Sequence, residues 1–284
     1  MSKQIGVLGC GWLGTPLALR LIQKGFQVRG STTRTEKVTA LKKSGIEASK
    51  IRLGESEIEG EIKSFLKGLD CLILNIPPGL RANCQGDFVA IIQLLEAHLL
   101  EAGIPHLIFV SSTSVYGNTS GEVCETNLPL PESETGKQLV AIENLLLANT
   151  LRKTQIVRPG GLLGSDRHPV FTLSGRSFHS GGNDRVNLIR LEDLLNILGL
   201  LISTGSESGT YNAVYPDHPT KRDFYTREAS YFGIAPPSYS GLPGPPKGKK
   251  VLCPALQALG YRFSQSIWTA ALHSGSGDPQ KSTE

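Results

Sequence analysis

The 284-residue sequence predicts an α/β fold in which a doubly wound parallel sheet carries helices on both faces. A strand, a helix and a second strand occur within the first 31 residues, as a parallel βαβ unit requires. Apolar strands and amphipathic helices then alternate up to about residue 160. Because ligands of such sheets bind beyond the C-terminal ends of the strands, we expect the functional residues in the loops after strands.

The opening βαβ unit is defined by its apolar pattern. Gln4 to Leu8 is predicted as a buried strand, and Gln27 to Ser31 as its neighbour. Between them lies a helix that we expect Gly25 to end. This helix carries apolar residues at every fourth position: Leu13, Leu17 and Leu21.

The alternation continues in the middle of the chain. Strands are predicted over residues 71–75 (CLILN) and 106–110 (HLIFV), and another begins at Gln155. One helix ends at Gly103 and has an apolar face formed by Phe88, Ile91, Ile92, Leu95 and Leu99. The next helix has an apolar face formed by Leu139, Ile142, Leu145 and Leu146.

Beyond residue 160 the pattern is less regular, which predicts a smaller C-terminal region that covers the substrate. We expect helices over 192–201 and 222–232, a strand over 211–215 and a Pro/Gly-rich connection over 235–250. The predicted domains are a core over residues 1–160, a smaller region over 161–273 interleaved with the last sheet strands, and a flexible tail over 274–284.

Composition excludes several classes of protein. With 39% hydrophobic and 19% charged residues, the chain is neither disordered nor membrane-embedded. The net charge of +4 is not gathered into a stripe that would bind nucleic acid, so a small, possibly anionic molecule is the expected partner. The five cysteines are Cys10, Cys71, Cys84, Cys124 and Cys253, an odd, widely spaced set without a zinc pattern. We therefore expect reduced thiols, a cytoplasmic location and no bound metal.

The N-terminal apolar run resembles a signal peptide only superficially. Three glycines interrupt it, and they form the pattern G-x-G-x-x-G over Gly9, Cys10, Gly11, Trp12, Leu13 and Gly14. A predicted strand precedes this pattern and a predicted helix follows it, which is typical of the dinucleotide-binding turn of a Rossmann fold. The alternative is a flexible glycine-rich loop without a ligand.

The end of the second strand predicts the type of dinucleotide. NAD-binding proteins place an Asp or Glu there for the ribose hydroxyls, whereas this chain has Ser31, Thr32, Thr33 and Arg34, with Lys37 one turn later. Hydroxyls and cations suit a 2′-phosphate, so NADP(H) is predicted, with NAD possible. The alternative for Arg34 is a solvated side chain at a helix start. The loop of Asn75, Ile76 and Pro77 is expected beneath the ribose and pyrophosphate.

Four further segments resemble the extended short-chain dehydrogenase/reductase superfamily of the NAD-dependent epimerase/dehydratase type. They are SSTSVYG (111–117), VRPGGLLG (157–164), VNLIRLED (186–193) and GTYN (209–212), and together they span most of the chain. The sequences of these segments are similar to those of an atypical bacterial group of that superfamily. The resemblance implies a Rossmann fold, a nicotinamide cofactor and an oxidoreductase or epimerase/dehydratase-like activity.

The chain departs from the superfamily at the Tyr-x-x-x-Lys pair that supplies and tunes the acid/base group. Aligned on Gly136, Thr135 stands in the Tyr position and Leu139 in the Lys position. Neither side chain titrates near neutral pH. Lys137 lies about 200° around the helix from Leu139 and is expected to be solvated. The proton donor is therefore unassigned.

The resemblance also suggests residues for the substrate side. Ser112 aligns with the catalytic Ser/Thr, although hydroxyls at a strand end can simply satisfy backbone groups. Tyr116 is expected to pack in the core, and Asp193 to cap or pack a helix near the site. Thr113, Arg167 and His168 are candidate substrate ligands, with a structural role as the alternative for His168. Gly160, Gly161 and Gly164 are expected to shape this loop.

Together these features predict an NAD(P)-dependent oxidoreductase that acts on a small carbonyl or sugar-like substrate. In this prediction Ser112 polarises the substrate carbonyl. The absence of Tyr and Lys favours the alternative, a non-catalytic NADP(H)-binding redox sensor or regulatory protein. The retained serine loop and the Arg167-His168-Pro169 segment favour a substrate.

Overall fold

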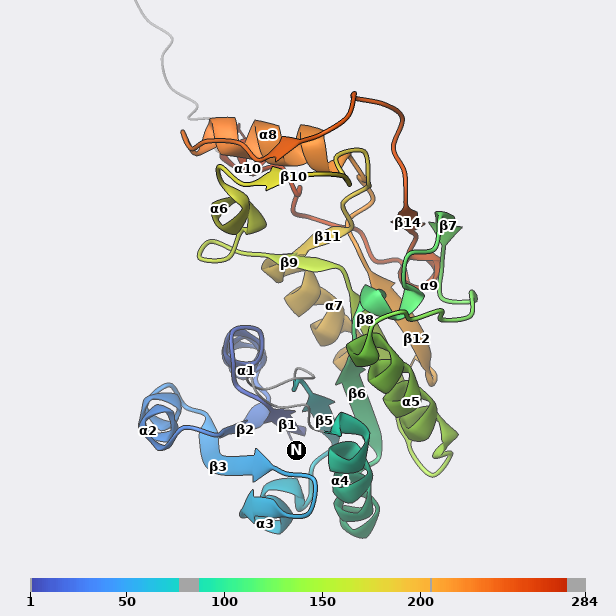
Figure 1. Cartoon of the computed structure of the whole chain (residues 1–284). Coiled ribbons are helices and arrows are strands. Elements are labelled where there is room, and N and C mark those ends of the chain that lie inside the picture. Colours follow the sequence, from blue (N-terminus) through green and yellow to red (C-terminus); the bar gives the residue numbers. More distant parts are fainter. Residues whose placement is uncertain (1, 77–86, 205, 275–284) are drawn as a thin grey trace, which may run out of the picture.

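The computed structural model describes residues 2–76, 87–204 and 206–274 (Figure 1). Up to residue 110 the elements are β1 (Gln4–Leu8), α1 (Gly14–Gln23), β2 (Gln27–Thr32), α2 (Thr35–Lys43), β3 (Glu47–Leu53), β4 (Ile58–Gly60), α3 (Ile62–Leu66), β5 (Cys71–Leu74), α4 (Phe88–Ala102) and β6 (His106–Val110).

Between residues 113 and 203 follow the short 3-10 helix η1 (Thr113–Tyr116), β7 (Gly121–Val123), α5 (Glu134–Ala148), β8 (Lys153–Pro159), β9 (Gly161–Leu163), α6 (Pro169–Leu173), β10 (Ser177–Phe178), β11 (Leu188–Arg190) and α7 (Leu191–Ser203). The remaining elements are β12 (Gly209–Ala213), α8 (Lys221–Tyr231), β13 (Ser238–Tyr239), β14 (Lys249–Val251), α9 (Pro254–Ala258) and α10 (Thr269–Ser274).

Eight of the strands form one sheet in the order β12-β8-β6-β5-β1-β2-β3-β4. All neighbouring pairs are parallel except β3 and β4 at one edge. From β1 the chain first runs outward through β2 and β3, and later returns to build the other half from β5. The sheet therefore switches direction between β1 and β5, and the predicted Rossmann-type α/β fold is confirmed.

Helices cover both faces of this sheet. Helix α4 packs against α3 and α5, while α1 packs against α7. Figure 1 shows the layers, with β9, β11, α6, α8 and α10 gathered beyond the sheet strands. Most buried apolar side chains belong to the core of the sheet. A second, smaller cluster includes Leu163, Val170, Leu188, Phe224 and Ile267. We propose that the chain divides near residue 160 into the sheet core and a smaller region that contains this second cluster.

Most predicted elements match the observed ones. The first strand has the predicted bounds, and Gly25 follows α1 with a φ of 85°. Gly103 ends α4 in the left-handed conformation, with a φ of 62°. The Pro/Gly-rich connection is observed as a largely irregular segment that contains only the short strand β13 and the start of β14. The predicted tail lies outside the described residues beyond Ser274.

Some predictions need correction. No strand is predicted over residues 47–60, where β3 and β4 occur. In β3, buried Ala48, Ile51 and Leu53 alternate with charged residues, so this strand lacks the continuous apolar run of its neighbours. The strand predicted at 211–215 is β12, which begins and ends two residues earlier than predicted and is the edge strand of the main sheet, as the predicted interleaving of this region with the last sheet strands requires. Strand β5 ends at Leu74, one residue earlier than predicted.

A buried ion pair connects α4 to the start of β8. Arg152 Nη2 lies 2.7 Å from Glu96 Oε2, and the exposed fractions of the two side chains are 3% and 11%. Asn149 donates a second hydrogen bond to this carboxylate at 2.8 Å. Removing the arginine would leave a buried carboxylate without its cation.

We expect Arg152→Met to lower the free energy of unfolding by about 3–5 kcal/mol, because an unpaired buried charge is left behind. Urea unfolding monitored by circular dichroism measures the change. Arg52→Met is the matched control, since the Arg52–Glu59 pair is about half exposed and contributes less than about 1 kcal/mol. Equal losses of unfolding free energy in Arg152→Met and Arg52→Met would contradict the conclusion that burial makes the Arg152–Glu96 pair important for stability.

Candidate cofactor and substrate cleft

A cleft of about 1350 Å³ lies at the C-terminal ends of the parallel strands. It runs over the ends of β1, β2, β5, β6 and β8, which is where the fold predicts ligands. Sequence-predicted residues that line it are Gly9, Cys10, Gly11, Trp12, Leu13, Ser31, Thr32, Arg34, Asn75, Ile76, Ser112, Thr113 and Arg167. Gly14 and His168 do not line it. Pro77 lies outside the described residues.

The glycine turn after β1 is held by backbone packing. A Cβ atom on Gly14 would lie 2.1 Å from the Gly9 carbonyl oxygen, and a Cβ on Gly9 would lie 2.2 Å from the Asn75 oxygen. Gly9 also has a φ of 110°, which favours glycine. A Cβ on Gly11, by contrast, would meet no protein atom within 4 Å. Gly9 and Gly14 are therefore required by the fold, while Gly11 leaves open space in the cleft.

Side chains from two neighbouring strands hold this turn. The Asn75 amide donates to the Gly9 carbonyl oxygen at 3.0 Å, and the Ser31 hydroxyl accepts from the Gly9 amide at 3.0 Å. The turn lies at the N-terminus of α1, whose first N–H groups and dipole favour an anion. The Cys10 thiol is buried, which raises its pKa to about 11, so only the backbone of Cys10 suits ligand binding.

The end of β2 presents hydroxyl and cationic groups to the cleft. Thr32 Oγ1 accepts a hydrogen bond from the Arg34 amide at 3.3 Å. The Arg34 side chain is 62% exposed, and its Nε lies 3.9 Å from Glu36. Lys37 also lines the cleft. A guanidinium and an ammonium thus stand beside the hydroxyl of Thr32.

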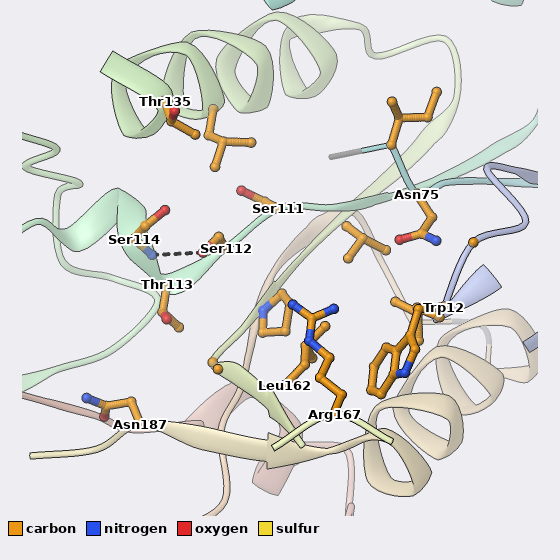
Figure 2. Close-up of a pocket in the computed structure, with 18 of the residues that line it drawn as sticks. Trp12, Asn75, Ser111, Ser112, Thr113, Ser114, Thr135, Leu162, Arg167 and Asn187 are labelled. Atoms are coloured by element: carbon orange, nitrogen blue, oxygen red, sulfur yellow. Dashed lines mark hydrogen bonds between the residues drawn. The ribbon is translucent and has the colours of Figure 1, made fainter. Parts of the chain in front are cut away.

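The serine-rich loop after β6 forms the centre of the cleft. Ser112 precedes η1, and its hydroxyl oxygen accepts from the Ser114 amide at 3.1 Å, as Figure 2 shows. Accepting this bond leaves the hydroxyl hydrogen free for a ligand. Thr135 and Leu139 of α5 line the same cleft, whereas Lys137 is exposed and lies 3.8 Å from Glu134. Lys137 is therefore exposed, as predicted, and is not part of the cleft lining.

A buried polar network beneath the serine loop was not predicted. The Glu143 carboxylate accepts from the Ser111 hydroxyl at 2.5 Å and from Arg158 Nη2 at 2.5 Å. Arg158 Nη1 donates to the Tyr116 hydroxyl at 2.8 Å, and that hydroxyl donates to Asn212 Oδ1 at 2.9 Å. Burial raises the pKa of the Tyr116 phenol, so it stays protonated.

This network makes Tyr116 a structural residue, as expected. Its ring is 1% exposed and does not line the cleft. A signal for the network was present in the sequence, because Glu143 lies one turn after Leu139 on the apolar face of α5. A carboxylate at that position requires a buried partner.

The loop between β9 and α6 packs on the glycine turn. The Trp12 indole donates to Asp166 Oδ1 at 2.8 Å, and the Arg167 guanidinium lies 5.0 Å from the Trp12 ring centroid. Figure 2 shows the side chains of Trp12 and Arg167 beside each other. A Cβ atom on Gly164 would lie 2.4 Å from the indole. Trp12 thus packs the glycine turn against the loop between β9 and α6, the two loops predicted to bind cofactor and substrate.

The structure corrects the prediction for His168. Its Nδ1 accepts from the Val170 amide at 3.1 Å, which caps α6, and its Nε2 lies 3.2 Å from Glu228. The ring stacks on Phe224 at a centroid distance of 5.7 Å. His168 is 6% exposed and therefore has the structural role that was its alternative. Pro169, which starts α6, was the sequence signal for a cap.

Asp193 has the predicted packing role. Its buried carboxylate accepts from the Tyr261 hydroxyl at 2.7 Å and from the amides of Ser264 and Gln265 at 2.9 Å each. These bonds attach the C-terminal segment to the start of α7.

Several residues that line the cleft were missed because they come from distant parts of the chain. They are Asp184, Arg185, Asn187, Lys221, Tyr225 and Lys249. Lys221 Nζ lies 3.1 Å from Asp184 Oδ2. Tyr225 is 7% exposed, and burial raises the pKa of its phenol to about 12. This side of the cleft is rich in cations.

The described ranges contain no group of three or more His, Cys, Asp or Glu side chains that could hold a metal ion. None of the helices described there is long and apolar enough to span a membrane. Cys10, Cys71, Cys124 and Cys253 are free thiols, and Cys84 lies outside those ranges.

Two solved structures share this fold over almost their whole length. MoeE5 in complex with UDP-glucuronic acid and NAD superposes with a TM-score of 0.76 and 21% identity, over 93% of this chain and 95% of that chain. UDP-glucuronic acid 4-epimerase from Bacillus cereus, in complex with NAD, gives a TM-score of 0.76 and 19% identity over 93% of both chains. At these identities the likeness shows the fold.

Sequence comparison shows the family. Residues 4–88 match the model of the NAD binding domain of 6-phosphogluconate dehydrogenase. Protein YeeZ of Escherichia coli (strain K12) is 34% identical over 251 residues, which cover 87% of this chain and 90% of YeeZ. The chain therefore belongs to the family of protein YeeZ.

Proposed function

We propose that the chain is an NADP(H)-dependent oxidoreductase that acts on a small carbonyl or sugar-like substrate in the cytoplasm. One observation carries this proposal: a single cleft contains both the glycine turn with Arg34 and the serine loop with Ser112. A dinucleotide that extends from Arg34 over the glycine turn would therefore end beside the serine loop. Substrate and cofactor would share one space.

The residues of the first half of the cleft fit the dinucleotide. Gly11 leaves open backbone for a pyrophosphate, and the N-terminus of α1 favours its charge. Thr32, Arg34 and Lys37 offer a hydroxyl and two cations to a 2′-phosphate. The Ser31 hydroxyl accepts a hydrogen bond from the Gly9 amide of the turn, and Asn75 and Ile76 line the cleft beside it. When bound, the nicotinamide supplies or accepts hydride.

The second half of the cleft suits an oxygen-rich, anionic substrate. Ser112 has a free hydroxyl hydrogen to donate to a carbonyl oxygen, and Thr113 stands beside it. Arg167, Arg185 and Lys221 bring positive charge, of which Asp184 balances part. MoeE5, a structural neighbour, binds UDP-glucuronic acid, an anionic sugar nucleotide. This supports a phosphorylated or carboxylated sugar-like substrate for the present chain.

The second candidate is a non-catalytic NADP(H)-binding redox sensor. The observation that favours it is the pair Thr135 and Leu139, which face the cleft where the superfamily carries Tyr and Lys. Incubation with NADPH and a panel of aldehydes, ketones and nucleotide sugars separates the candidates. Oxidation of NADPH by any carbonyl class supports the enzyme. Tight NADPH binding without turnover of the whole panel supports the sensor.

We expect Gly11→Ala to weaken NADPH binding without lowering the melting temperature. Its methyl group meets no protein atom but occupies space for the pyrophosphate, at a cost of about 1–3 kcal/mol. That corresponds to roughly 10- to 100-fold in Kd, measured by isothermal titration calorimetry. Gly209→Ala, which lies in β12 outside the cleft and has comparable room, should change neither quantity. Unchanged affinity in Gly11→Ala would remove the turn from the cofactor site.

We expect Arg34→Ala to weaken NADPH binding roughly tenfold and NADH binding little, because a charge-assisted contact to an exposed phosphate contributes about 1–2 kcal/mol. Fluorescence titration with both dinucleotides gives the ratio. Arg52→Ala is the control, since Arg52 is also a surface arginine but does not line the cleft. Tighter binding of NADH than NADPH by the unaltered protein would refute the predicted preference.

We expect Ser112→Ala to lower turnover of the best carbonyl substrate roughly 100-fold, as loss of one oxyanion donor does in other enzymes. The Kd for NADPH should stay the same. Ser112→Thr retains a hydroxyl that can also accept from the Ser114 amide, so it controls for damage to η1. Full activity in Ser112→Ala would exclude this residue from the reaction.

A further inference from the structure

A lysine from the C-terminal part of the chain lies at the serine loop. Lys249 is the first residue of β14 and lines the cleft together with Ser112 and Thr113. Its Nζ donates to the carbonyl oxygen of Thr113 at 3.1 Å and to that of Gly117 at 2.6 Å. The ammonium is therefore fixed at the residue next to Ser112.

The backbone of Lys249 is held from two sides. Strand β14 pairs with β7, with Lys249 opposite Gly121. Asn187, which also lines the cleft, donates to the Lys249 carbonyl oxygen at 3.0 Å and accepts from the Val251 amide at 2.9 Å. Figure 2 shows Asn187 below the serine loop. These contacts hold the backbone of Lys249 beside the cleft.

The ammonium retains a hydrogen for a ligand. A protonated lysine has three N–H donors, and the two carbonyl oxygens use two of them. Burial lowers the pKa of Lys249, while the charge of Glu132 opposes this shift. Arg185, which donates to the Gly248 carbonyl oxygen at 3.4 Å, adds a second cation nearby. Lys249 can therefore release a proton more easily than an ordinary surface lysine.

Other side chains of the cleft are less suited to proton transfer. Thr135 and Leu139 occupy the expected positions on α5 but do not titrate near neutral pH. Tyr225 belongs to the second apolar cluster, and burial holds the pKa of its phenol at about 12. Lys249 is hydrogen-bonded to the serine loop itself.

We propose that Lys249 Nζ is the proton donor for the substrate oxygen that Ser112 polarises, and so replaces the Tyr and Lys missing from α5. This inference rests on the proposed function. In the reduction, the carbonyl carbon accepts hydride from the reduced nicotinamide and the C=O π bond breaks. The oxygen takes a proton from Nζ and becomes a hydroxyl, and the neutral amine regains its proton from water. In the oxidation, the neutral amine accepts the proton.

The first test measures the proton on Nζ without any substrate. Protein labelled with ¹⁵N-lysine is titrated by NMR, and Lys249→Arg identifies the Lys249 ammonium signal. We expect its titration midpoint below that of the lysines in the urea-unfolded protein. A midpoint at or above the unfolded value overturns the inference.

The second test separates proton transfer from structural support. Lys249→Arg keeps a cation for the Thr113 and Gly117 carbonyls but does not give up a proton near neutral pH, whereas Lys249→Met removes both. We expect both variants to reduce the best carbonyl substrate at least about 100-fold more slowly, with the NADPH Kd within about twofold of the unaltered protein. Lys250→Met is the matched control, because Lys250 pairs with Glu122 away from the cleft.

The pH profile completes the test. The rate of carbonyl reduction by the unaltered protein should fall as the pH rises through the NMR midpoint, and Lys249→Arg should lose that dependence. A Lys249→Arg variant with more than half of the original rate would show that only the cation is needed. That result would overturn the inference about Lys249 and leave the proposed function unaffected. Absence of turnover by the unaltered protein would overturn the proposed function and this inference with it.

Discussion

The close approach of three backbone segments at the C-terminal end of β1 is the constraint on which the site depends. The β1 turn, the start of α1 and the loop after β5 meet with no room for a Cβ atom at Gly9 or Gly14. Asn75 and Ser31 then satisfy polar groups of the turn from the two neighbouring strands. Because the sheet switches direction between β1 and β5, this packing places the N-terminus of α1 at the point where the fold predicts ligands.

A second constraint lies under the serine loop. The carboxylate of Glu143 is fixed by Arg158 and holds the hydroxyl of Ser111, so the loop rests on a buried, charged base rather than on apolar packing alone. Such a network is stable only when its polar groups are paired. Tyr116 completes it, which explains why a phenol so close to Ser112 in sequence takes no part in the cleft.

The C-terminal region contributes side chains to the lining of the cleft. Trp12 links the glycine turn to the loop before α6, and Asn187 fixes the strand that carries Lys249. Thr135 and Leu139 of α5 bring no titratable group to the cleft, whereas β14 brings Lys249 to the serine loop. The acid/base chemistry that we propose for this cleft therefore comes from a different part of the chain than α5.

The sequence by itself determined the fold and the location of the cleft. The fold and the cleft could be predicted from apolar periodicity, the glycine pattern and the residues after β2 and β6. Each of these features involves residues that are close together in the sequence, so it can be recognised without the structure. Strand β3 was missed because its apolar residues alternate with charges, and His168 was misjudged because its partner Glu228 lies 60 residues away. Only the tertiary structure brought Lys249 to Thr113 and Arg158 to Glu143. Contacts between distant segments depend on the packing of the whole chain: a local pattern can show that Glu143 needs a buried partner, but it does not show which residue that partner is.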